Sequence, residues 1–414
     1  TREERYRNYL LAMHGANSIV VGTRSAIFAP IKNLATVIVH KESSLDHYEI
    51  RSPGWNTRTV ALLRSEFQSL RLILTGFSPS IEVAQLIDER KVKYLNSKEN
   101  VNVKAFTPSE GALLPGRIFG DIKKALAIGP VLFIAPRKGY GNALLCAHCR
   151  NVGSCDCGGR LSVSAKGKAP SCVHCGKAFQ EWKCSFCNRD KQYLAGRGIE
   201  RAAEEISRAF PNFPVVISAG DVIKDRIDPK PSLVLATAGA QPQVEGGYAA
   251  VVILDGMRFF AHTDLRTQER ARELFLETAS LISPKGFVLL VIDDSHPIVS
   301  AISRWNIAPL LKRELSERSE LCLPPSVFSV VLVMDQAIGV QIANGLKKSA
   351  LEGRIPQSSR IYGPTEISKD EVKIVIHVDK KDAPALTNTV YELQRRRSIA
   401  KKELFTLRVE PYSL

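Results

Sequence analysis

The sequence contains no apolar run that approaches the roughly 20 residues needed to cross a bilayer. It begins with the polar, charged stretch TREERYRNYL, so we expect no secretory signal peptide. Cysteine is scarce outside one short segment, where eight of the nine cysteines lie; the other is Cys322, which we expect to be a small apolar residue. These absences argue against a membrane protein and a secreted disulfide scaffold, so we expect a cytoplasmic protein with no membrane contact.

Acidic residues are also relatively few, with 42 Asp and Glu against 57 Lys and Arg, which gives a net charge of +15. This excess favours a nucleic-acid partner, because bound Lys and Arg displace counterions from phosphates. An inert basic surface stays open as the alternative. The densest local charge comprises Arg395, Arg396, Arg397, Lys401 and Lys402. We predict that these residues bind DNA phosphates, although a solvated helix end would show the same pattern.

The eight clustered cysteines have metal-ligand spacing. They form four short pairs: Cys146 and Cys149, Cys155 and Cys157, Cys172 and Cys175, and Cys184 and Cys187. Two such pairs complete a tetrahedral four-thiolate zinc site, so four pairs predict two zinc ions. The C-x-C pair is one residue short of the usual spacing and is the weakest ligand assignment. His148 and His174 lie inside C-x2-C pairs and are alternative ligands, but we expect them to be bystanders.

Alternating helical and strand patterns predict an α/β fold with several domains, because short Val, Ile and Leu runs between helices are typical of parallel sheets. For example, we expect a helix over residues 2–13 and strands at SIVVGT (18–23) and PVLFIAP (130–136). The α/β pattern stops at the cysteine segment, 146–187, and then resumes, so the segment is predicted to be an insertion. The sequence LPPS predicts a boundary near residue 323, followed by a small α+β unit over 323–414.

Several motifs in order resemble the PriA family of replication-restart primosome proteins, also called primosomal protein N-prime. The motif that resembles the family's G-x-G-T-E-R segment is GRGIERAAEEISRAFP, and DLRTQER is similar to its D-F-R-A-x-E-R segment. The resemblance extends from Val20 to Pro411, and the motifs that carry it lie at Val20–Val39, Phe133–Cys149, Gly196–Pro211, Asp264–Arg270 and Arg313–Pro325, with LRVEP near the end.

The resemblance implies two RecA-like helicase lobes, of which the first is incomplete. The remnant of lobe 1 would cover 1–103 and lobe 2 would cover 104–322, with the two-zinc module inserted and a C-terminal DNA-binding domain over 323–414. It also implies nested zinc sites. The first would use Cys146, Cys149, Cys184 and Cys187, and the second Cys155, Cys157, Cys172 and Cys175. Its implied partners are forked or single-stranded DNA, single-stranded-DNA-binding protein, primosome proteins and the replicative helicase.

The sequence departs from the family where ATP chemistry takes place. No G-x4-G-K-[ST] phosphate loop occurs, and the family's D-E-E-H reads His40-Lys41-Glu42-Ser43. A lysine at position 41 would repel Mg²⁺, and Glu42 reads as an ordinary polar residue. The family's arginine motif is replaced by Glu277–Gly286, which contains no arginine. We therefore expect no catalytic or ATP-binding residues in this chain, although ATP and Mg²⁺ are cofactors of the family.

These patterns favour a monomeric replication restart protein of the bacterial cytoplasm, associated with the nucleoid. It would bind branched DNA and help to assemble the primosome at stalled forks, without helicase activity of its own. One alternative is an active ATP-dependent 3'-5' DNA helicase whose phosphate loop lies upstream of this chain. The other is a zinc-dependent protein-interaction module that binds no DNA.

Overall fold

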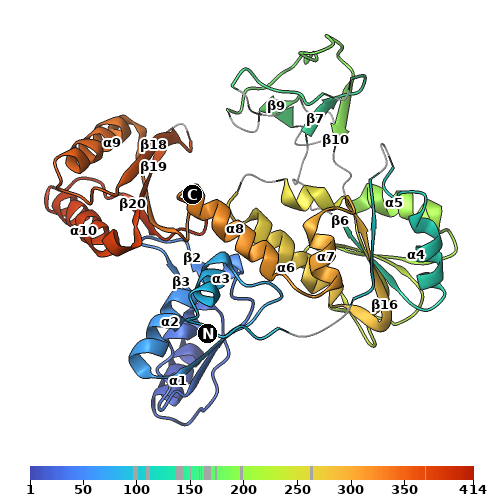
Figure 1. The fold of residues 1–414 in the computed structure, drawn as a ribbon, viewed down its shortest axis with the longest axis horizontal. Coiled ribbons are helices and arrows are strands. Elements are labelled where there is room, and N and C mark those ends of the chain that lie inside the picture. The colour runs from blue at the N-terminus through green and yellow to red at the C-terminus, as the bar shows by residue number, and fades with distance from the viewer. Residues whose placement is uncertain are drawn as a thin grey trace. The chain divides into compact units, whose positions relative to one another are not determined.

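The computed structural model describes the chain except residues 97–100, 109–111, 136–142, 150, 158, 160, 163–168, 173–174, 196–198, 262–263 and 369. The predicted mixed α/β class is confirmed, since helices alternate with strands in most of the chain (Figure 1). The chain forms two compact units that interleave in sequence. The first comprises Thr1–Asn96, Asp264–Glu273 and Ile307–Leu414, and the second comprises Ser97–Thr263 and Leu274–Asn306.

The second unit is built on a six-stranded sheet in which all neighbouring strands are parallel. Every residue of its strands β6, β13 and β15 is buried, which explains their continuous Val, Ile and Leu runs. The strand order is β11 (Val215–Ser218), β13 (Leu233–Thr237), β6 (Val131–Ala135), β15 (Tyr248–Ile253), β16 (Ile282–Val291) and β5 (Val103–Phe106).

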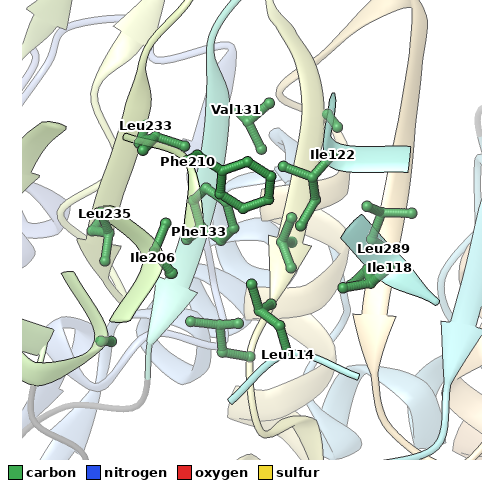
Figure 2. Packing of buried hydrophobic residues seen from close by; sticks show 14 of the residues in the cluster. Leu114, Ile118, Ile122, Val131, Phe133, Ile206, Phe210, Leu233, Leu235 and Leu289 are labelled. Atoms are coloured by element: carbon green, nitrogen blue, oxygen red, sulfur yellow. The ribbon is translucent and has the colours of Figure 1, made fainter. Parts of the chain in front are cut away.

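Helices α4 (Ile118–Leu126) and α5 (Ile199–Ala209) pack on one face of this sheet. Figure 2 shows Ile118 and Ile122 of α4, Ile206 of α5 and Phe210, which follows α5, in one cluster with alternate strand residues such as Val131 and Phe133. Alternation follows from the pleat, which points successive side chains to opposite faces. This core includes strand β6 and helix α5, which precede and follow the cysteine segment in the sequence.

The remaining elements of the second unit are short. Strands β7 (Ala143–Cys146) and β10 (Gln192–Ala195) pair antiparallel, as do β8 (Leu161–Ser162) and β9 (Ser171–Cys172). Strands β12 (Arg226–Ile227) and β14 (Gln243–Val244) pair parallel. Helix α7 (Pro297–Ser303) begins after His296, whose ring accepts from the backbone N–H of Ile298. Helix α6 (Thr267–Ala279) spans the sequence boundary between the two units.

The N-terminal part of the first unit contains three capped helices and little sheet. In α1 (Arg2–Met13), Thr1 and Glu4 form a capping box. Asn56 and Ser80 cap α2 (Thr57–Gln68) and α3 (Ile81–Asp88). Strands β1 (Thr36–Val39) and β4 (Arg71–Leu74) pair parallel, and β2 (Tyr48–Glu49) pairs antiparallel with β3 (Trp55–Asn56). The predicted strand at 18–23 is wrong: these residues form no strand, and a 3-10 turn, Arg24–Phe28, follows.

The C-terminal part of the first unit is an antiparallel sheet in the order β18, β19, β17, β20. These strands are Arg360–Glu366, Glu371–Asp379, Val327–Asp335 and Thr406–Val409. Helices α9 (Gln336–Leu351) and α10 (Ala383–Ile399) contribute Ala343, Leu346, Leu386 and Val390 to the core of this sheet. Helix α8 (Ala308–Glu320) precedes it. The α+β pattern expected beyond residue 323 is present, although β18 is not among the predicted elements. Helix α8, which lies before residue 323, is not among them either.

None of the helices in the described part of the chain combines the length and the apolar character needed to cross a membrane.

Candidate metal centres and nucleic-acid surface

Four cysteines meet where the chain enters and leaves the inserted segment. In the β7–β10 pair, Cys146 lies opposite Gln192, and Leu145 forms a further bridge with Val152. This pairing brings the first C-x2-C turn to the last one. The Sγ atoms of Cys146 and Cys187 are 3.4 Å apart, and those of Cys149 and Cys184 are 3.5 Å apart. We call this group cluster 1; its four sulfur atoms all lie within 4.8 Å of one another.

The other four cysteines form a second group, cluster 2, supported by the β8–β9 pair. Leu161 lies opposite Cys172 in that pair. The Sγ of Cys155 is 3.6 Å from that of Cys175, and the Sγ of Cys157 is 3.5 Å from that of Cys172. The C-x-C pair therefore reaches the cluster despite its short spacing. Both groups match those that the family resemblance implies. Of the two suggested substitute ligands, His148 is exposed, and His174 lies outside the described residues.

The sulfur geometry fits a tetrahedral thiolate site. With a Zn–S distance of about 2.3 Å, neighbouring sulfurs of a tetrahedron are about 3.8 Å apart. The four sulfur–sulfur separations given above, 3.4 to 3.6 Å, are close to this value. Backbone N–H groups also point at the sulfurs. A bond from the backbone of Cys149, with a second from His148, lowers the pKa of Cys146 to about 6 despite partial desolvation.

Each cluster also contains a thiol that its neighbours hold in the protonated form. A backbone N–H bond from Arg189 lowers the pKa of Cys187, but burial and the adjacent thiols outweigh it and raise the pKa to about 12. Cys157 behaves similarly: Gly159 lowers its pKa, whereas Cys172 and Cys175 raise it to about 12. Four thiols crowded in this way cannot all ionise without a cation among them. The donor set therefore suits a soft divalent ion, and four protein ligands leave no open position for catalysis.

A small apolar core includes cysteines of both clusters. Leu144, Leu161 and Trp182 pack with the cysteines, and Trp182 is only 5% exposed. Trp182 is therefore a residue of this core. Phe186 differs, since its ring is 68% exposed. The sequence alone could not separate the roles of these two aromatic residues.

The five cations proposed to bind DNA do not all face solvent without a partner. Arg395 pairs with Glu392 on the same helix at 2.9 Å. Arg397 stacks on Phe405 at 4.1 Å and donates from Nε to the backbone oxygen of Glu403. Arg396, Lys401 and Lys402 are exposed, and no ion pair involves them among the described residues. These three are therefore the cations best placed to meet phosphates.

The region where the resemblance would place nucleotide chemistry is occupied by buried ion pairs. Glu42 is 2% exposed and accepts hydrogen bonds from the backbone N–H of Ser80 at 2.6 Å and from Arg58 at 3.1 Å. Reading Glu42 as an ordinary polar residue is thus wrong, because its carboxylate is already engaged inside the fold. Arg58 also reaches Glu82, at 3.3 Å.

Arg266 extends the same network from a distant part of the sequence. Its guanidinium contacts Glu82 at 2.5 and 2.8 Å and Glu269 at 3.2 Å. Its Nε donates to the backbone oxygen of Tyr412 at 2.6 Å. Burial raises the pKa of Glu82, but the charges of Arg266 and Arg58 outweigh burial and hold that pKa well below its ordinary range. We refer to Glu42, Arg58, Glu82, Arg266 and Glu269 as the buried ion network.

Taken together, the fold and the clusters define a mixed α/β protein with two four-cysteine groups suited to metal ions. The chain is 31% identical over 386 residues to the Mycobacterium leprae protein named "Probable replication restart protein PriA", covering 88% of this chain and 58% of that protein. It is 33% identical over 392 residues to the protein of the same name from Mycobacterium tuberculosis, covering 88% and 59%.

A more distant relative is the "Replication restart protein PriA" of Bacillus subtilis, 20% identical over 436 residues, which cover 96% of this chain and 54% of that protein. The resemblance to PriA that the motifs predict is therefore confirmed. The chain spans somewhat less than three fifths of the length of the mycobacterial relatives that it matches. No protein-family model matches the chain.

Proposed function

We propose that this chain acts in replication restart by binding branched DNA and helping to assemble the primosome at stalled forks. The observation that carries the proposal is the similarity to proteins named replication restart protein PriA over 88% of the chain. The two cysteine clusters support it, because they group the residues as the resemblance implies. Single-stranded-DNA-binding protein and the replicative helicase would be its partners, and the chain would act as a monomer in the cytoplasm and at the nucleoid.

The same resemblance supplies the proposed domain plan. Residues 1–103 would be a remnant of a RecA-like lobe, and 104–322 a second RecA-like lobe built on the parallel sheet. Residues 146–187 would be a module with two structural zinc ions, and 323–414 a DNA-binding domain. The six parallel strands and the helices on them are consistent with the second lobe.

The proposed role does not include ATP hydrolysis. Phosphoryl transfer needs carboxylates that hold Mg²⁺ and orient water, and it needs cations that face the transferred phosphate. Here Glu42 accepts from Ser80 and Arg58, and Arg58 and Arg266 are committed to Glu82. These groups are paired with one another, and Glu42, Arg58 and Arg266 are buried, so they support a structural role for the region.

DNA contact is proposed at Arg396, Lys401 and Lys402, which carry exposed charge near the end of α10. Binding there would follow the phosphate backbone and show no base readout. Arg395 and Arg397 would contribute less, because Glu392 and the Phe405 ring already engage them.

The test is binding of the full chain to a forked duplex over a range of salt concentrations. We expect tighter binding to the fork than to a blunt duplex, and an affinity that falls with salt. The variant Arg396→Gln/Lys401→Gln/Lys402→Gln should lower the salt slope by about 2 to 3, since each phosphate contact contributes about 0.9. Arg2→Gln/Arg5→Gln/Arg7→Gln removes equal exposed charge from α1 and should change the slope little.

The two alternative functions give different results in the same assay. A chain that hydrolyses ATP at motor rates when forked DNA is added would be an active helicase and would contradict the scaffold role. A chain with no measurable affinity for any fork would be an interaction module, and the proposed function would fail.

A further inference from the structure

The cysteine module exposes an aromatic ring on the turn that closes cluster 1. Phe186 lies between Cys184 and Cys187, and its ring is 68% exposed although Trp182, four residues earlier, is buried. The turn is fixed at both ends, because the Cys184 backbone N–H donates to the Arg189 oxygen and the Asn188 N–H donates to the Cys184 oxygen. An exposed ring on a rigid turn loses little conformational freedom when a ligand stacks on it.

Three exposed cations, Lys183, Arg189 and Lys191, flank this ring within five residues. The backbone oxygen of Arg189 accepts from Cys184, and that of Lys191 accepts from Ala147 in the partner turn. The backbones of Arg189 and Lys191 are therefore anchored to cluster 1, while the side chains of all three cations are exposed. None of the three takes part in an ion pair among the described residues.

Two acidic residues, Glu181 and Asp190, are exposed in the same stretch and oppose these cations. The wider module is nevertheless basic, since residues 143–195 contain eight Lys and Arg against three Asp and Glu. A phosphate chain passing over the turn would therefore meet a net positive surface.

Near cluster 2, a lysine and a phenylalanine contact groups of the module itself. Lys177 forms an ion pair with Asp156 at 2.7 Å and lies 5.3 Å from the centre of the Phe179 ring. Phe179 is partly buried against the core of the module. Lys177 and Phe179 therefore contact each other near cluster 2. Near cluster 1, Phe186 and its neighbouring cations are exposed and can contact a ligand.

We propose that Phe186, with Lys183, Arg189 and Lys191, forms a stacking platform for single-stranded nucleic acid. A base stacks on the exposed ring, and the flanking cations contact the phosphates on either side. This arrangement tolerates any sequence, because every base has a π-face. The inference rests on the proposed function in that it gives the module a contact with the unpaired arm of a fork.

The test measures affinity of the metal-loaded full chain for a single-stranded oligonucleotide that carries 2-aminopurine. Phe186→Ala should weaken binding about 5- to 100-fold and reduce the fluorescence quenching that stacking causes. Phe186→Trp should preserve both signals. The matched control, Val152→Ala, removes another exposed apolar side chain (46% exposed) of the module and should leave both unchanged.

The cations have their own matched control. Lys183→Gln/Arg189→Gln/Lys191→Gln should reduce the salt slope of single-strand binding by about 2 to 3, whereas Lys177→Gln, which removes a paired cation, should not. Metal content of each variant verifies that the module has folded. If Phe186→Ala binds single strands and forks as tightly as the unmodified chain, the platform does not exist but the proposed function stands. If the unmodified chain binds no fork, the proposed function itself fails.

Discussion

The buried ion network and the cysteine module both gather ionisable side chains, but they differ in how the charges of these side chains are balanced. Both gather groups that can carry charge, and in both some of these groups are buried, where an unpaired charge is costly. In the network, Arg58 and Arg266 neutralise carboxylates of the same chain. In the module, thiols meet thiols, and four thiolates in one cluster would need a cation among them. The first region therefore contains its own counter-charges, whereas the second does not.

The largest difference between the two regions should appear when metal is removed. A chelator should unfold the module, because structural zinc contributes about 10–16 kcal/mol to the folding of comparable small domains. The buried ion network should remain folded, since its partners are all side chains. Hydrogen exchange followed by segment checks this, with loss of protection expected over 143–146 and 192–195 and none over α2 and α3. Equal loss in both regions would show that the two do not differ in this way.

A charge deletion tests the other half of the comparison. Arg266→Met leaves the buried carboxylate of Glu269 and the partly buried carboxylate of Glu82 without their common partner, and breaking a buried pair in this way costs about 3–5 kcal/mol. Denaturant unfolding measures the loss. The control is Arg313→Met, which removes one exposed partner of Glu317 and should cost less than about 1 kcal/mol. Equal effects of the two variants would contradict the structural importance of the network.

The two regions also differ in how well the sequence predicts them. The grouping of the cysteines can be predicted from local spacing and the family resemblance, because each cluster takes its four ligands from two short cysteine pairs. The network joins Glu82 to Arg266 across 184 positions, and no local pattern indicates such a pair. Glu42 therefore reads as an ordinary polar residue until the fold places Arg58 and Ser80 beside it.

The strands and helices also differ in whether the local sequence predicts them or whether they depend on residues far away in the chain. The apolar run of β6 predicts a buried strand, and the sheet on both sides of it confirms this. The run at 18–23 is also apolar but forms no strand. A strand is stable only when a neighbouring strand pairs with it, and an apolar run alone does not reveal whether such a neighbour exists. Helix α8 escapes prediction because its pattern is polar; its buried side chains include Glu314 and Arg318, which pair at 2.6 Å.

A smaller effect should distinguish the two clusters within the module. Cys146 is buried in the β7–β10 pair, whereas Cys157 is exposed at the edge of cluster 2. Cys157→Ser should release one ion and leave cluster 1 loaded, and Cys146→Ser should release the other ion and also disturb the β7–β10 pair. Native mass spectrometry counts the ions. Cys322→Ser, outside both clusters, should retain them all, and loss of metal from that variant would contradict the ligand assignment.

The smallest expected effect is a pH dependence of the C-terminal sheet in the first unit. Burial lowers the pKa of His377 below its ordinary value of 6.5, with a smaller opposite effect from the backbone oxygen of Cys322. The unfolded chain therefore binds this proton more readily than the folded chain, so His377 reduces stability as the pH falls below about 6.5. Denaturant unfolding between pH 5 and 8, the range over which histidine titrates, should show this loss of stability. His377→Gln should flatten the profile, and an unchanged profile would contradict the assignment.

The most direct test of the central claim is the metal content of the full chain, purified without added metal and measured by elemental analysis against protein concentration. We predict two zinc ions per chain, one for each cluster. One ion would show that cluster 2 or cluster 1 is not a metal site. A chain that is folded in residues 143–195 without any metal would contradict the proposal that the cysteine module, unlike the buried ion network, needs metal to fold.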